Sequence, residues 1–206
     1  GAEARAGRAA VFEPERSAWL ERAAGPLPAD GSGPDLEGES GTIAFALEPV
    51  ATAALLERAR EAWRADAEAV LVSALGRSLT EWSGLDEVVV DVEGHGREDL
   101  GDGLDLSRTV GWLTSIRPVR LRAAGDLGDV KDELRHAARR GLGHGVLRWL
   151  HPDDGLRARL AASGGAGLVF NYLGRLEPGG GPFEVVDEPA GPLRDPSAPR
   201  RHAIEV

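Results

Sequence analysis

Residues 88–98 read Val-Val-Val-Asp-Val-Glu-Gly-His-Gly-Arg-Glu, an apolar run that ends in a turn broken by two glycines. Four valines among the first five positions favour a buried β-strand. The glycines let the chain leave a sheet in conformations closed to most residues. The turn carries a carboxylate, an imidazole and a guanidinium, from Glu93, His95 and Arg97. We therefore expect the chemistry of the protein at this strand end.

Helical and strand patterns alternate along the rest of the chain. Because the two kinds of element are interspersed, the sequence predicts an α/β fold, a two-layer sandwich of helices on a mixed sheet. Helices are expected over residues 14–24, 51–62, 66–82, 127–140 and 153–162. Strands are expected over residues 42–47, 87–92, 109–121, 167–173, 183–186 and 202–206.

Single residues mark several element ends. Asp66 is a capping residue for the helix of residues 66–82, and Gly84 is a fitting stop. Thr52 is the candidate N-cap of the preceding helix. Pro118 has no backbone N–H to donate, so we expect it to break any central strand pairing.

Two regions are expected. Residues 1–41 predict a helix followed by a linker, since Gly, Pro, Asp and Ser dominate residues 25–41. Residues 42–206 predict a lobe large enough to bury a core of its own.

Composition excludes several classes of function. A formal net charge of −10 argues against nucleic-acid binding, which needs clustered Lys and Arg. The absence of Cys excludes disulfides, thiolate metal sites and cysteine nucleophiles. No apolar run approaches the roughly 18 residues of a membrane span, and no leader opens the chain. We expect a cytoplasmic protein without a membrane partner.

Four segments resemble the motifs of one family. Residues 93–98, 107–114, 141–148 and 170–174 are similar, in order and spacing, to motifs of the epimerization domains of nonribosomal peptide synthetases. Those motifs read EGHGRE, RTVGWFT followed by Pro, PxxGxGYG and FNYLG. The first and the last are matched letter for letter. The resemblance covers the chain from about Trp19 to Val206.

Four residues depart from the family motifs. Leu113 stands at a usual Phe, Arg117 at a usual aromatic, Ala138 at a usual Pro and His144 at a usual Tyr. These departures concern the fine substrate preference more than membership of the family.

The resemblance implies a chloramphenicol acetyltransferase-like lobe. Such domains have two lobes, and their N-terminal lobe supplies a His-His-x-x-x-Asp-Gly motif that this sequence does not contain. The chain also has no Met, and residues 201–206 read as a strand cut in mid-course. We therefore expect the C-terminal lobe alone, inactive without its partner lobe.

Glu93 is the acid/base residue that the resemblance implies. It would exchange a proton with the α-carbon of a thioester while facing a His of the absent lobe. A free Glu has a pKa of about 4.3, so this hypothesis needs a dry cleft around the carboxylate. The alternative is that Glu93 only accepts hydrogen bonds from the turn amides.

Asn171 and Tyr172 are the other catalytic candidates. They follow each other on a predicted strand, so only one of them can face the cleft. Tyr172, the only Tyr of the chain, is a candidate to stabilise an enolate oxygen, or else caps a buried amide.

Five further residues are expected to support the site or line its channel. His95 would orient Glu93, contact the carrier arm or brace the turn, and Arg97 would pair with the adjacent glutamate or with a carboxylate of a neighbouring loop. Arg108 and Trp112 belong to the stretch that forms the channel floor in the family. His144 is expected one layer behind the reacting groups. No histidine spacing suggests a metal site.

The leading hypothesis is an epimerase that interconverts L and D configuration on a carrier-bound aminoacyl or peptidyl thioester. The expected partners are a peptidyl carrier protein, the absent lobe and neighbouring synthetase domains. No cofactor is expected to bind directly, because the substrate arrives on the carrier's 4′-phosphopantetheine. The alternatives are a condensation domain that forms peptide bonds and a non-catalytic scaffold for docking carrier proteins.

Overall fold

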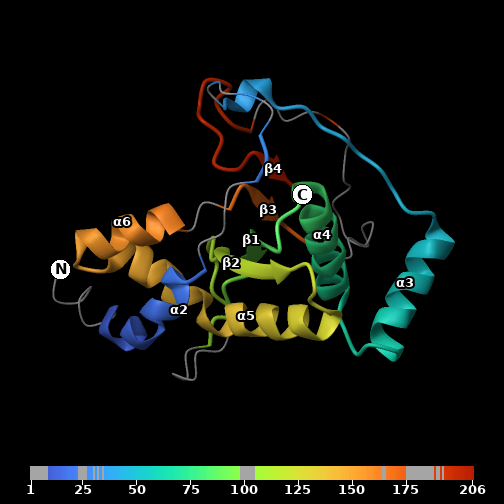
Figure 1. Cartoon of the computed structure of the whole chain (residues 1–206), viewed down its shortest axis with the longest axis horizontal. Helices are drawn as coiled ribbons and strands as arrows, with labels where there is room; N and C mark the ends of the chain where they lie inside the picture. Colours follow the sequence, from blue (N-terminus) through green and yellow to red (C-terminus); the bar gives the residue numbers. More distant parts are fainter. Residues whose placement is uncertain are drawn as a thin grey trace.

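The computed structural model describes residues 9–22, 27–29, 31, 33, 35–97, 105–163, 166–174, 188, 191 and 193–206. In this part of the chain, one mixed sheet has the strand order β2-β1-β3-β4 (Figure 1). The strands are β1 (Glu87–Gly94), β2 (Ser115–Arg122), β3 (Leu168–Phe170) and β4 (Ile204–Glu205). β1 runs antiparallel to β2 and parallel to β3, and β3 is parallel to β4.

Helices pack on this sheet and on one another. They are α2 (Arg16–Leu20), α3 (Pro49–Glu61), α4 (Ala67–Ser83), α5 (Leu127–Leu150) and α6 (Asp154–Ser163), with 3-10 turns η1 (Glu13–Glu15) and η2 (Glu37–Glu39). Figure 1 shows α4 and α5 beside the sheet, α2 and α6 at one end of α5, and α3 beyond α4. The α/β class and the mixed sheet predicted from the sequence are confirmed.

The main core lies between the sheet and helices α4 and α5. Val88, Val90 and Val92 alternate along β1 and are fully buried, so one face of this strand supplies the core. Leu121 on β2 and Val72 on α4 belong to the same cluster. Val89, Asp91 and Glu93 therefore lie on the opposite face of the sheet.

Helix α4 has the ends that the sequence predicts. Asp66 is the N-cap, and its carboxylate accepts a hydrogen bond from the Ala69 N–H at 2.8 Å. Gly84 ends the helix in the left-handed region with φ +69°. Helix α3 differs from the prediction, because its N-cap is Glu48 and Pro49 occupies the first turn. Thr52 lies inside that turn and is not the cap.

Helix α5 is longer than predicted. The sequence ends this helix at residue 140, whereas the helix continues through three glycines to Leu150. Gly141 lies so close to Arg117 that a Cβ would come within 3.0 Å of its side chain. Leu147 is fully buried beneath α2 and α6. Tertiary packing thus outweighs the poor helix propensity of glycine here.

A second, smaller core joins the N-terminal helix to the body. Trp19 of α2 is 3% exposed and packs with Leu147 of α5 and with Leu156 and Leu160 of α6. The segments near the two chain ends are also linked, because Arg200 Nε donates to the Asp35 carboxylate at 2.8 Å.

Some predicted strands differ from the structure. Residues 42–47 are extended and exposed but form no strand, because no described segment pairs with them. β2 begins at Ser115, so residues 109–114 are loop. Pro118 lies within β2, opposite Asp91, and is tolerated because β2 is an edge strand. The predicted strand over residues 183–186 lies outside the described residues.

Candidate active site

Glu93 lies near the end of β1, opposite Ile116 of β2. Opposed residues in a ladder point to the same sheet face, as do residues two apart along a strand. Glu93 therefore shares its face with Ile116 and with the buried Asp91. Its side chain is half-buried, so any dry environment around the carboxylate needs a further covering surface.

The end of β3 lies beside the end of β1. Val92 pairs with Phe170, and this register sets Asn171 next to Glu93. Phe170 is buried in the main core together with Val92. If alternation continues past Phe170, Asn171 is on the face of Glu93 and Tyr172 is on the opposite one. The backbone N–H of Asn171 donates to the Val206 carbonyl at 2.8 Å.

The turn after β1 is braced by its own residues. Gly96 has φ +65°, and a Cβ there would overlap the carbonyl oxygen of Leu113. The Nδ1 atom of His95 accepts a hydrogen bond from the Arg97 N–H at 2.9 Å. The Arg97 guanidinium donates to the Leu106 carbonyl at 2.6 Å. Glu98, its predicted ion-pair partner, lies outside the described residues.

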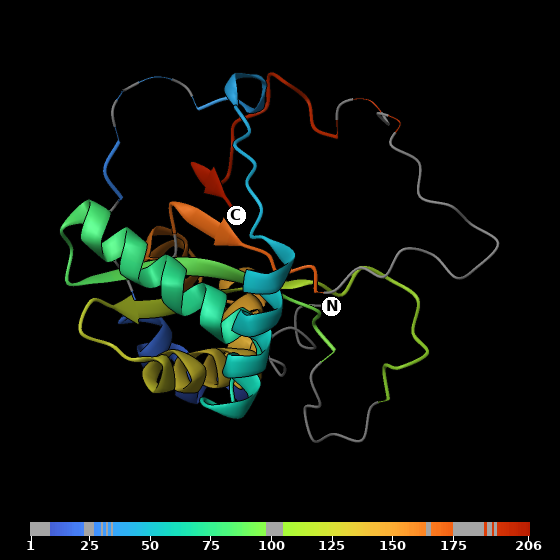
Figure 2. The ribbon, with the colours of Figure 1, turned by 90° about the vertical axis from the view of Figure 1, so that its right-hand side faces the viewer.

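Arg108 and Trp112 are both exposed in the structure. Both lie on the described part of the loop before β2, and Trp112 is 90% exposed. Figure 2 shows this loop, in yellow-green, reaching away from the sheet. A floor for a channel would require this loop to meet another surface.

His144 lies in the second half of α5 and is 9% exposed. Its ring lies 5.1 Å from the Trp19 ring, measured between centroids. Burial is the main cause that lowers the pKa of His144 to about 4; the charge of Asp91 opposes it, and the charges of Arg148, Arg201 and Arg22 add to it. His144 is therefore neutral at physiological pH.

Asp91 and His202 form a buried pair that the sequence alone did not indicate. The His202 Nε2 atom donates to Asp91 Oδ2 at 2.8 Å, and their side chains are 6% exposed or less. A signal was present, because Asp91 interrupts a run of buried valines. A carboxylate in such a strand requires a partner, although its identity could not be read from the sequence.

A cavity of about 330 Å³ opens on the face that carries Glu93. We call it the strand-end cavity. Residues of three elements line it, including Asp91 of β1, Ile116 of β2 and His144 of α5. Arg148 and Arg201 supply two guanidinium groups.

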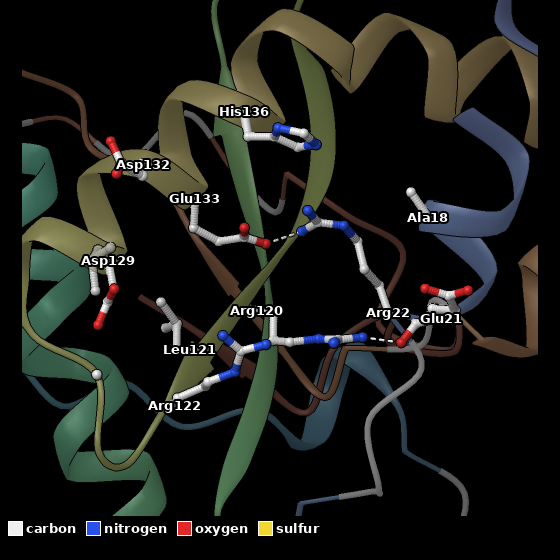
Figure 3. Close-up of a pocket in the computed structure, with 12 residues that line it drawn as sticks. Ala18, Glu21, Arg22, Arg120, Leu121, Arg122, Asp129, Asp132, Glu133 and His136 are labelled. Atoms are coloured by element: carbon white, nitrogen blue, oxygen red, sulfur yellow. Dashed lines mark hydrogen bonds and ion pairs between the residues drawn. The ribbon is translucent and has the colours of Figure 1, made fainter. Parts of the chain in front are cut away.

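A larger cavity of about 440 Å³ lies between α2, β2 and the first half of α5 (Figure 3). Its arginines are engaged within the protein. Arg22 pairs with Glu133, and Arg120 donates to the Glu21 carbonyl. None of the site residues predicted from the sequence lines this cavity, so it is not the candidate active site.

The described residues contain neither a membrane-spanning helix nor a cluster of metal ligands. Among them no helix is long and apolar enough to cross a membrane. Nor do three or more His, Asp or Glu side chains gather in these segments as a metal site would need.

A family model for the condensation domain matches residues 3–148. The chain belongs to the condensation-domain family. Its relatives are peptide synthetases. Over 95% of the chain it is 38% identical to one subunit of the linear gramicidin synthase of Brevibacillus parabrevis. Over the same share it is 34% identical to surfactin synthase subunit 1 of Bacillus subtilis strain 168. The chain spans only 4% and 6% of the length of these two relatives.

Solved structures agree with this condensation-family membership. The epimerization domain from the third module of tyrocidine synthetase B superposes with a TM-score of 0.80 at 29% identity. The match covers 98% of this chain and 50% of that one. The first condensation domain of the CDA synthetase gives a TM-score of 0.52 at 24% identity, over 82% of this chain and 35% of that one. This second likeness concerns the fold alone.

The structure thus brings some of the predicted site residues together and leaves others exposed on a loop. Glu93 and Asn171 lie at adjacent strand ends, with the His95–Arg97 turn following β1. His144 lines the strand-end cavity on the same face. Arg108 and Trp112 lie exposed on the loop before β2.

Proposed function

We propose that the chain is the C-terminal part of an epimerization domain. Such a domain interconverts L and D configuration at the α-carbon of an aminoacyl or peptidyl thioester on a carrier protein. The observation that carries the proposal is the half-buried carboxylate of Glu93 at the end of β1, beside the end of β3. The match of residues 93–98 and 170–174 to the family motifs and the TM-score of 0.80 support it.

The chemistry is a proton exchange at carbon. A base removes the α-proton, and the electron pair of the C–H bond moves into an enolate whose charge rests on the thioester oxygen. An acid then returns a proton to the opposite face of the planar enolate. Glu93 acts as one of these two groups. Continued alternation after β3 would put Asn171 on the face of Glu93, which favours its amide over the Tyr172 hydroxyl as hydrogen-bond donor to the enolate oxygen.

The group that returns the proton is not His144. With a pKa of about 4, this imidazole is uncharged at neutral pH, and the N–H of an uncharged imidazole is too weak an acid for this step. We propose that the group is the His implied by the resemblance, on a surface that faces Glu93. That same surface would exclude water from the half-buried carboxylate and so raise its basicity.

The proposed substrate arrives on a partner. A peptidyl carrier protein would present the thioester at the end of its 4′-phosphopantetheine arm, and neighbouring synthetase domains would supply and accept it. The relatives at 38% and 34% identity are named as subunits of linear gramicidin synthase and surfactin synthase, and this chain spans only 4% and 6% of their length, which supports such neighbours. The chain itself would hold no cofactor.

Peptide-bond formation is the second candidate function. The matching family model describes the condensation domain, and this favours it. Both reactions would use a carrier-bound thioester, but condensation requires a second carrier-bound amine and no exchange of the α-proton. The two functions therefore differ in their products.

The test uses the complete gene product in deuterated water with an L-aminoacyl carrier protein, alone or with a second aminoacyl carrier. Epimerization predicts α-deuterium uptake, detected by mass spectrometry, and a mixture of L and D residues with the first carrier alone. Dipeptide formed without deuterium uptake would establish the condensation alternative instead.

A further inference from the structure

The strand-end cavity has an unusual balance of charge for this protein. The chain has a net charge of −10, yet two guanidinium groups, of Arg148 and Arg201, line this space of about 330 Å³. Asp91 is the one carboxylate among its lining residues. The Oδ2 atom of that carboxylate already accepts a hydrogen bond from His202 at 2.8 Å.

The remaining groups of the cavity do not neutralise the two arginines. His144, which also lines it, is a neutral imidazole at physiological pH. Burial and the neighbouring charge of Arg201 lower the pKa of Arg148, and the charge of Asp91 opposes them only in part, so the two cations still repel each other across the cavity. The Arg148 guanidinium stacks over the Trp149 ring, 4.6 Å from its centroid, and this contact orients it. A bound anion would relieve the repulsion.

The cavity is close to the candidate acid/base residue. Asp91 precedes Glu93 by two residues on the same face, a distance of about 7 Å along a strand. Ile116, directly opposite Glu93, lines the cavity. An anion in the cavity would thus be attached near the carbon that Glu93 deprotonates. The phosphate of a pantetheine arm lies at the other end of that arm from the thioester, which makes it the poorer fit.

We propose that Arg148 and Arg201 bind a side-chain carboxylate of the substrate, so that the protein prefers thioesters of aspartyl or glutamyl residues. This inference rests on the proposed function, because it assumes that Glu93 acts on an aminoacyl thioester. Arginine suits this role, since its planar guanidinium can bind a carboxylate through two parallel hydrogen bonds. The serine hydroxyl of Ser115 adds a further polar group to the lining.

The test compares carrier proteins loaded with L-Glu and with its uncharged isostere L-Gln, using the complete gene product. We expect α-deuterium uptake at low carrier concentration to be about 10-fold faster with L-Glu, the factor expected of one charge-assisted hydrogen bond. Arg148→Gln and Arg201→Gln should bring the ratio of the two rates close to one. Arg201→Lys should restore part of it. Arg159→Gln, an exposed arginine of α6, is the matched control and should leave the ratio unchanged.

Binding of L-glutamyl and L-glutaminyl pantetheine amides provides a readout that does not depend on turnover. Tighter binding of the glutamyl amide, lost in the Arg148 and Arg201 variants, supports the subsite. It does so even if no α-deuterium is taken up, because absence of uptake would refute only the proposed function. Equal binding and equal rates overturn the subsite while leaving epimerization intact. If the arginine variants slow both substrates equally, the arginines bind the phosphate of the arm and the side-chain assignment is wrong.

Discussion

The carboxylate of Asp91 and the imidazole of His202 form a buried pair at 2.8 Å although 111 residues separate them along the chain. Asp91 lies in the middle of β1, and His202 closely precedes β4. β3 lies between these two strands. The pair therefore ties the C-terminal segment to the strand that carries Glu93.

Removing His202 should destabilise the protein strongly. His202→Ala leaves the Asp91 carboxylate buried without its partner, which typically costs about 3–5 kcal/mol of unfolding free energy. Urea denaturation at pH 7 measures the loss. The double variant with Asp91→Asn should lose less than the two single variants added together, because it removes the unpaired charge. A loss below about 1 kcal/mol in His202→Ala would contradict a stabilising pair.

His144 should make the stability of the fold depend on pH. Its pKa is lowered by burial to about 4, against about 6.5 when unfolded. Between these values the unfolded chain binds the proton and the folded chain does not, so stability is lost as pH falls from 6.5 toward 4. The loss between pH 7 and pH 4.5 should be about 2–3 kcal/mol from this group.

The matched variant is His144→Gln, which cannot titrate. We expect the unfolding free energy of both proteins, measured with urea, to fall between pH 7 and pH 4.5. The fall should be about 2–3 kcal/mol smaller in the variant than in the wild type. Parallel pH profiles for the two proteins would show that His144 titrates normally.

Gly96 should tolerate alanine less well than Gly84. Both have a left-handed backbone, at φ +65° and φ +69°. A Cβ on Gly84 meets nothing within 4 Å, whereas one on Gly96 overlaps the Leu113 carbonyl. Gly84→Ala should cost about 1–2 kcal/mol, and Gly96→Ala about 1–3 kcal/mol more. Equal losses in chemical denaturation would show that the turn after β1 does not pack against Leu113.

Trp19 tests whether the N-terminal helix belongs to the folded body. Trp19→Ala should cost about 3–5 kcal/mol, because the side chain fills the second core with Leu147 and Leu156. Trp112→Ala, at a position 90% exposed, should change the unfolding free energy by less than about 0.5 kcal/mol. A small loss for Trp19→Ala would mean that residues 9–22 dock only weakly.

The sequence predicted those elements whose position is set by residues that are neighbours along the chain. The valine run of β1 and the caps of α4 at Asp66 and Gly84 depend on neighbouring residues, so the pattern sufficed. The second half of α5 could not be predicted this way. Its glycines are helical because Gly141 and Gly143 allow close approach of Arg117 and of η1, which are distant in sequence.

The candidate site also combines features set by neighbouring residues with features set by residues distant in sequence. The motif at residues 93–98 predicted Glu93 as the acid/base residue, and that role stays a prediction. The Asp91–His202 contact and the position of Arg201 in the strand-end cavity were missed, because they depend on how the C-terminal segment folds back beside the sheet. For residues 42–47, alternation predicted a strand, but a strand also requires a partner, and the described residues offer none.

The central claim is that the Glu93 carboxylate transfers the α-proton, and Glu93→Gln tests it most directly. The variant keeps the size of the side chain and removes its basicity. In deuterated water, with an L-aminoacyl carrier and the complete gene product, we expect α-deuterium uptake to fall by about 10²–10⁴-fold. Glu87→Gln, at the other end of β1, should retain the wild-type rate. Uptake at the wild-type rate by a folded Glu93→Gln protein would contradict the account.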